Sequence, residues 1–123
     1  MLGGKGRPDA LLISEAPWIV VAEVASSATY NVLEQELDQG EAMAVCFALE
    51  NPAESLLILD EASARRKARA LGLRVIGSIG VLWRAASSGK IKSFENAVAD
   101  IESTGFWLKP ELKKKILADW ARR

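Results

Sequence analysis

Residues 55–89 read SLLILDEASARRKARALGLRVIGSIGVLWRAASSG, and this stretch predicts the architecture of the chain. Four consecutive apolar residues, Leu56–Leu59, end in Asp60 and Glu61, a pattern that favours a strand covered on both faces. The ten or so residues that follow are good helix formers and contain no Gly or Pro before Gly72, which predicts a helix. A strand, an acidic pair and a helix therefore follow one another.

The same alternation repeats directly afterwards. Leu73–Ile76 predicts a second short strand, and Ser78 is placed to cap a helix over Ile79–Ser88. Strands that alternate with helices favour a parallel sheet with right-handed crossovers. Ligands of such sheets bind at the carboxyl ends of the strands. The acidic pair that begins at Asp60 therefore lies where a functional site is expected.

Composition indicates one ordinary globular domain. The 123 residues are 50% hydrophobic and 26% charged, which suits a single core. No apolar run approaches the roughly 20 residues of a membrane span, and the first residues lack the apolar centre of a signal peptide. We therefore expect a single domain over residues 1–123, with residues 1–6 flexible, located in the cytoplasm and not in a membrane.

The chain contains no histidine and only one cysteine, Cys46. Histidine bases and ligands, intramolecular disulfides and cysteine-rich zinc sites are therefore excluded. Cys46 lies in the apolar run Met43–Leu49 and is expected to be buried as a small hydrophobic residue. Any acid–base or metal chemistry must rest on carboxylates.

A net charge of zero conceals an uneven distribution of charge. Residues 1–61 hold eleven acidic and two basic residues, a net charge of −9, whereas residues 62–123 hold five acidic and fourteen basic residues, a net charge of +9. One interpretation is an acidic site flanked by a basic surface that receives a polyanion. The other, which the charges alone favour, is that the two halves attract each other across solvated faces.

The remaining expected elements are a short helix over Asp9–Glu15, a strand over Trp18–Val24, a helix from about Ser26 to Leu37, a helix over Gly40–Glu50, a helix over Phe94–Ser103 and a last helix from Pro110 to about Ala121. β-Branched residues indicate the strand, and Asp38 and Ser93 are placed to cap two of the helices. The helix that Asp38 begins is apolar nearly all round and is expected to be buried. Glu41 lies in its first turn, where the helix dipole favours a carboxylate, so a structural and a functional role for Glu41 are equally supported.

Several segments occur in an order that resembles the PIN-domain superfamily. They are LDQGEA at residues 37–42, LLILDEASARRKARALGL at residues 56–73, VIGSIGVLWRAASSGKI at residues 75–91 and TGFWLKPELKKKIL at residues 104–117. The likeness is closest to a prokaryotic PIN-like branch related to VapC-type toxins, and it covers the chain from about Arg7 to the C-terminus. It implies a three-layer α/β/α sandwich with a short parallel sheet.

The resemblance also implies an activity, the hydrolysis of RNA with Mg²⁺ or Mn²⁺ held in an acidic pocket. Such hard cations prefer carboxylate oxygens and need neither histidine nor cysteine. Carried over residue by residue, the implied catalytic and metal-binding residues are Glu41, Asp60 and Glu61. The family usually has one essential acid at this strand end, and both Asp60 and Glu61 remain candidates.

Substrate-binding residues and partners follow from the same resemblance. Ser78 matches a small hydroxyl residue of this branch at the pocket, and it has an equally good explanation as a helix cap. If the chain is a nuclease, Arg65, Arg66 or the C-terminal lysines would hold RNA phosphate, although each arginine is more simply explained as a surface charge of its helix. A toxin role would add an antitoxin protein as a partner.

The chain departs from the family pattern at its N-terminus. A full-length relative begins with a central strand that ends in an Asp, and no such segment precedes Gly6. The resemblance therefore implies an N-terminally truncated PIN-like domain in which the strand beside Leu56–Leu59 is missing. A free central strand edge favours association, so we expect a homodimer or a higher homo-oligomer.

Three functions stay open at this point. The first is a metal-dependent ribonuclease, with a toxin–antitoxin role as its extension. The second is a catalytically inactive, truncated PIN-like domain that acts as an interaction or regulatory protein, motivated by the missing N-terminal Asp. The third and weakest is a small nucleic-acid-binding protein that uses the basic C-terminal half, including Lys113–Lys115.

Overall fold

The computed structural model describes residues 15–123, and every structural statement below concerns that part of the chain. Its elements are α2 (Ser27–Leu33), α3 (Gln39–Glu50), β1 (Leu57–Ile58), α4 (Ala62–Ala70), β2 (Val75–Ile76), α5 (Ser78–Ser87), α6 (Phe94–Ser103) and α7 (Pro110–Arg122). The predicted flexibility of residues 1–6 and, apart from Glu15, the predicted helix over Asp9–Glu15 lie outside the described residues.

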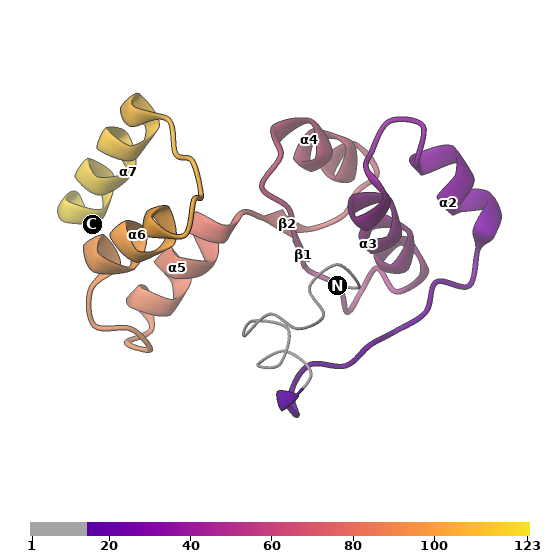
Figure 1. Cartoon of the computed structure of the whole chain (residues 1–123), viewed down its shortest axis with the longest axis horizontal. Helices are drawn as coiled ribbons and strands as arrows, with labels where there is room; N and C mark the ends of the chain where they lie inside the picture. The colour runs from indigo at the N-terminus through magenta and orange to yellow at the C-terminus, as the bar shows by residue number, and fades with distance from the viewer. Residues whose placement is uncertain (1–14) are drawn as a thin grey trace.

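The elements form two groups that meet where β2 leads into α5 (Figure 1). The first group holds α2, α3, α4 and the sheet, and the second holds α5, α6 and α7. β1 and β2 pair in parallel, with Leu57 opposite Val75 and Ile58 opposite Ile76, and α4 is the crossover between them. The predicted α/β class and the short parallel sheet are therefore confirmed.

β1 is covered on one face only. Leu57 and Leu59 are buried, whereas Leu56 is 44% exposed and Ile58 is 58% exposed. The prediction of a strand covered on both faces was therefore wrong. Alternate side chains point to opposite faces of a strand, and within residues 15–123 the first group covers only one of these faces.

The predicted strand over Trp18–Val24 does not form in the structure. This segment is irregular and extended, and the side chains of Trp18, Val20 and Val21 are almost fully exposed. β-Propensity expresses how well a residue fits a pleated, half-buried surface, so β-branched residues become a strand only beside a partner. None of the strands that the structure describes pairs with this segment.

The core of the first group is built mainly from small residues of α3 and α4 around the sheet. Ala42, Val45, Cys46, Ala64 and Ala68 are fully buried. The expected burial of Cys46 is thus confirmed. α3 packs its buried residues against the sheet, as expected, but Met43 and Phe47 remain partly exposed on one side of the helix.

Helix ends follow the predicted caps closely. Asp38 caps α3 in a capping box, because the Glu41 N–H donates to Asp38 Oδ1 (2.8 Å) and the Asp38 N–H donates to Glu41 Oε1 (3.2 Å). Ser93 caps α6, whose bounds are those predicted. The helix from Ser26 is shorter than expected, since α2 ends at Leu33 and not at Leu37.

The second group has an aromatic core. The ring of Trp83 from α5 meets those of Phe94 and Trp120 edge to face, with centroids 5.3 and 5.0 Å apart, and Phe94 and Trp120 lie 4.7 Å apart. These three rings hold α5, α6 and α7 together. No helix in the described part of the chain is long and apolar enough to cross a membrane.

Candidate functional site

Asp60 and Ser78 meet at the carboxyl ends of the two strands. Asp60 follows β1 and Ser78 follows β2, and parallel strands bring their carboxyl ends to one edge of the sheet. The Ser78 N–H donates to Asp60 Oδ1 (2.7 Å), and the Ser78 hydroxyl donates to Asp60 Oδ2 (2.6 Å). Both residues were predicted as site residues, Ser78 from the resemblance alone, and their functional role stays a prediction.

Ser78 has a different local role from the one predicted. The N-cap of α5 is Gly77, which provides no side chain, and Ser78 is the first residue of the helix. Its hydroxyl does not cap α5 but reaches back to Asp60. Asp60 therefore supplies from β1 the acceptor that a capping side chain would otherwise supply, at the end of the helix where the dipole favours an anion.

Arg65 contacts the backbone at the end of β1. Its Nη1 donates to the carbonyl oxygens of Leu59 (3.1 Å) and Asp60 (2.5 Å), so the guanidinium fixes the backbone that carries the carboxylate. A Cβ added at Gly77 would lie 3.3 Å from Asp60 Oδ1 and 3.6 Å from Arg65 Nη1. Glycine thus allows the close approach of the two strand ends.

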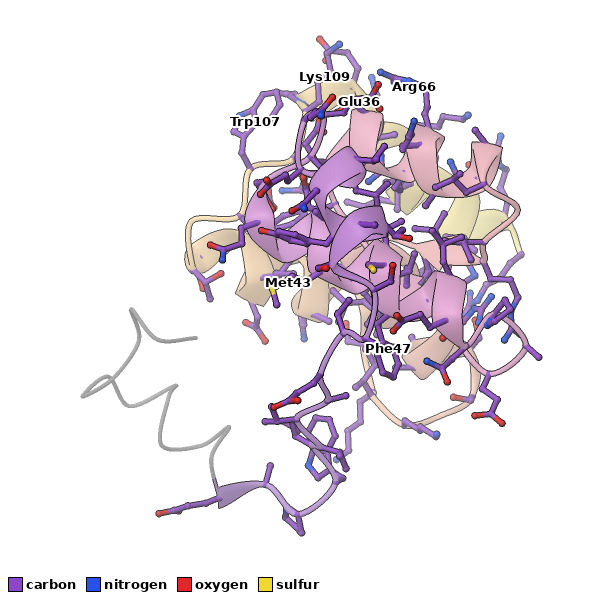
Figure 2. The ribbon with its side chains drawn as sticks, turned by 90° about the vertical axis from the view of Figure 1, so that its right-hand side faces the viewer. Glu36, Met43, Phe47, Arg66, Trp107 and Lys109 are labelled. Atoms are coloured by element: carbon purple, nitrogen blue, oxygen red, sulfur yellow. The ribbon has the colours of Figure 1, made fainter. Side chains whose placement is uncertain are left out.

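Glu61 and Arg66 take separate positions. Glu61 is the N-cap of α4, where its carboxylate accepts from the N–H groups of Ser63 and Ala64, each at 3.2 Å, and from the Ser63 hydroxyl. The Ser63 hydroxyl is the main reason that the pKa of Glu61 is lowered. Arg66 is exposed on α4 (Figure 2). The position of Glu61 therefore has a structural explanation.

The three predicted acids are not gathered into one cluster. Glu41 holds the first turn of α3, Glu61 holds that of α4, and Asp60 holds Ser78. Within residues 15–123 there is no group of three or more Asp, Glu, His or Cys side chains placed to hold a metal ion. These three carboxylates are therefore each used at the start of a helix.

A cavity of about 400 Å³ opens beside Asp60. It is lined by Asp60, Arg65, Gly77 and Ile79 at the strand ends, and by Phe106, Trp107, Leu108, Lys109, Leu112 and Ile116 from the loop before α7 and from α7 itself. Trp107 is 75% exposed, and Figure 2 shows it with Lys109 at the surface. The cavity thus combines one carboxylate, two cations and an exposed indole.

Sequence reasoning did not find Trp107 and Lys109. The available signal was a large aromatic residue between Gly105 and Pro110, in a loop that no apolar periodicity explains. Only the fold shows that this loop returns to the strand end that carries Asp60.

A family model described as a PIN domain matches residues 1–122. The chain therefore belongs to the PIN-domain family, and its mixed α/β structure with a short parallel sheet is consistent with the PIN-like α/β/α fold. PIN domains are nuclease-like, generally use divalent metal ions and typically bind RNA. No curated protein and no solved structure matches the chain.

The described carboxylates do not by themselves fit the divalent ion that PIN domains use. Mg²⁺ and related hard cations are held by several oxygen ligands in a defined geometry. Of the three predicted acids, only Asp60 lines the cavity, and both of its oxygens already accept hydrogen bonds from Ser78. No chemical step is therefore assigned to a metal ion at this site.

Proposed function

We propose that this PIN-domain chain is a ribonuclease that binds RNA in the cavity beside Asp60. The observation that supports it best is the position of that cavity, at the carboxyl ends of both strands and next to the Asp60–Ser78 pair. This is where parallel α/β sheets bind ligands. Membership in a nuclease-like family supports hydrolysis of RNA as the reaction.

The lining of the cavity suits single-stranded RNA. The exposed Trp107 indole offers a face for base stacking, which contributes about 1–3 kcal/mol per base in proteins that bind single strands. Lys109 and Arg65 supply positive charge for phosphate. Because Arg65 already holds two backbone carbonyls, we assign phosphate binding mainly to Lys109 and a positioning role to Arg65.

RNA binding is tested by the fluorescence anisotropy of a labelled single-stranded RNA titrated with the full chain. Trp107→Ala and Lys109→Ala are compared with Lys90→Ala, which changes an exposed lysine outside the cavity. Loss of one stacked base is expected to raise Kd about tenfold in Trp107→Ala. A Trp107→Ala variant that binds as well as Lys90→Ala would overturn this binding mode.

Cleavage with Mg²⁺ or Mn²⁺, with Glu41, Asp60 and Glu61 as ligands, is the finer form of the proposal. It requires ligands in addition to those that residues 15–123 bring together. RNA is incubated with either metal or with EDTA, and Asp60→Asn is compared with Asp100→Asn, an exposed acid on α6. Cleavage that needs metal, survives in Asp100→Asn and is lost in Asp60→Asn is expected.

A second candidate is a PIN-like protein that interacts or regulates without catalysis. The observation that favours it is the separate use of Glu41, Asp60 and Glu61 at three helix ends. RNA binding without cleavage at any metal concentration would favour this candidate. The toxin role, the antitoxin partner and the cytoplasmic location stay predictions from the sequence.

A further inference from the structure

A second and larger cavity, of about 730 Å³, lies between the segment Val20–Val24, α3 and β1, and is lined mostly by apolar residues. We call it the β1 groove. Its lining consists of Val20, Ala22 and Val24, of Met43, Ala44, Phe47 and Ala48 from α3, and of Glu54, Ser55, Leu56, Leu57 and Ile58. Met43 and Phe47 are one turn apart and therefore lie on the same face of α3 (Figure 2).

The groove borders a free edge of β1. The N–H groups of Leu57 and Leu59 donate to Arg74 and Ile76 of the β2 side, each at 2.9 Å. In a parallel ladder the peptide groups of the residue between them point the other way. The N–H and C=O of Ile58 therefore face the opposite edge, with which no strand in the described part of the chain pairs.

The segment Trp18–Val24 has the sequence of a strand but no ladder. Within the described residues its only backbone hydrogen bond runs from the Ile19 N–H to the Ala16 carbonyl. Trp18, Val20 and Val21 are 80%, 82% and 93% exposed. In an extended chain Trp18, Val20, Ala22 and Val24 share one face, and this face is entirely apolar.

Glu50 fixes the C-terminal end of this segment. Its carboxylate accepts the N–H groups of Ala25 (3.2 Å) and Ser26 (2.8 Å) at the entrance to α2. The segment therefore leaves the body of the protein from a defined point, where Val24 packs against the core, while Val20 and Ala22 line the groove and remain exposed.

We propose that two copies of this chain associate through the β1 groove, each inserting its Trp18–Val24 segment as an added strand on the free edge of β1 in the other. Within residues 15–123 the chain carries both a strand edge and an extended segment that lack a pairing strand, so a symmetric pair satisfies both at once. Strand addition supplies main-chain hydrogen bonds and places alternate side chains in the groove.

The area involved is sufficient for a stable pair. The exposed apolar side chains that would be covered are Trp18, Val20, Met43, Phe47, Leu56 and Ile58. Covering them would bury on the order of 800 Å² per copy, which is what one partner contributes to a standard protein–protein interface. An exposed edge and an exposed apolar strand in one chain otherwise invite aggregation.

The association is tested by sedimentation of the full chain over a range of micromolar concentrations. Ile58→Lys blocks the edge and Val20→Lys blocks the segment, while Val32→Lys places the same charge on an exposed valine of α2. We expect a dimer that the first two variants weaken by about a hundredfold in Kd, because a lysine would be buried in the interface, and that Val32→Lys leaves nearly unchanged.

Mixing the two blocked variants distinguishes strand exchange from a non-specific loss of self-association. Ile58→Lys keeps an intact segment and Val20→Lys keeps an intact edge, so a mixed pair retains one complete contact whereas neither variant alone does. The mixture is expected to associate more strongly than either variant. Circular dichroism of each variant confirms that the fold is retained.

The proposal fails if the chain is monomeric at all concentrations, as it would be if another part of the same chain filled the groove. It also fails if Ile58→Lys and Val20→Lys dimerise as well as Val32→Lys, or if the mixture associates no better than its components. RNA binding at the Asp60 cavity is measured in a separate experiment. Failure of the dimer proposal therefore does not count against the proposed function, and the reverse also holds.

Discussion

The two hydrophobic groups of this protein solve the same packing problem with different residues. The group around β1 packs helices closely through buried alanines such as Ala64 and Ala68, whereas the group of α5, α6 and α7 packs through Trp83, Phe94 and Trp120. Alanines permit close approach but bury little apolar area each, while an aromatic ring buries about 150–250 Å². The small-residue group therefore leaves an apolar groove open, and the aromatic group closes on itself.

The largest expected effect lies in the aromatic group. Phe94→Ala removes a fully buried ring that contacts both Trp83 and Trp120, and it should lower the free energy of unfolding by about 3–5 kcal/mol. Urea unfolding followed by circular dichroism measures the change, with Trp107→Ala as an exposed aromatic control that should change it by less than about 0.5 kcal/mol. A decrease in the free energy of unfolding of less than about 1 kcal/mol would show that the aromatic core is not tightly packed.

The small-residue group should respond to added volume. Ala68→Leu forces three extra carbons into a fully buried position on α4, and it should cost about 1–3 kcal/mol through displaced neighbours. Ala70→Leu makes the same change at an exposed position of the same helix. Equal unfolding midpoints for the two variants in urea would show that Ala68 has room beside it, contrary to the close packing described above.

The contact between β2 of the first group and α5 of the second is tested at Gly80. A Cβ at this position in α5 would lie 2.6 Å from Ile76 Cγ1 of β2, so Gly80→Ala should cost about 1 kcal/mol net even though alanine is the better helix former. At Gly40 a Cβ would meet only Asp38 Oδ1 at 3.7 Å, so Gly40→Ala should be neutral or stabilising.

Thermal unfolding measures both glycine variants. If Gly80→Ala raises Tm as Gly40→Ala is expected to do, α5 does not rest on β2 as closely as the structure indicates. Both variants replace glycine by alanine in a helix, so helix propensity changes in the same direction in both. A difference in the change of Tm between them therefore reports the contact with Ile76.

The smallest expected effect is a pH dependence in the first group. The pKa of Glu61 is lowered from its ordinary value of 4.5, mainly by the Ser63 hydroxyl, so Glu61 favours folding above that value and loses this contribution as the pH falls through its folded pKa. Ser63→Ala should therefore reduce the fall in Tm on acidification. Ser87→Ala, in α5, is the control, and identical Tm profiles for the two variants would contradict the role of Ser63.

Local signals in the sequence predicted much of the fold. Asp38 and Ser93 mark helix starts because their side chains accept the N–H groups that a first turn leaves free, and the structure has both caps. The strand near Leu57 was also predicted from its own residues, because four consecutive apolar side chains are typical of a buried strand. The segment Trp18–Val24 was mispredicted because a strand depends on a partner, which local sequence does not report.

The residues of the candidate site were likewise predictable only in part. The order of strands and helices predicted Asp60 at a strand end where ligands bind, whereas Ser78 was predicted at the pocket only from the family resemblance. The hydrogen bonds between Asp60 and Ser78 were not predicted. The contribution of Trp107 and Lys109 could not be predicted, because it depends on how a loop of the second group returns to the first. The prediction that Glu41, Asp60 and Glu61 act together remains untested by the fold.

The attachment of Ala25 and Ser26 to Glu50 also sets a natural boundary for limited proteolysis. A protease of broad specificity should cut within the exposed segment Trp18–Val24 and leave a resistant fragment that begins near Ala25 and keeps both hydrophobic groups. Trypsin cannot make this cut, because no lysine or arginine occurs between Arg7 and Arg65. The boundary thus gives a simple route to a shortened protein that retains the Asp60 cavity and lacks its own inserting strand.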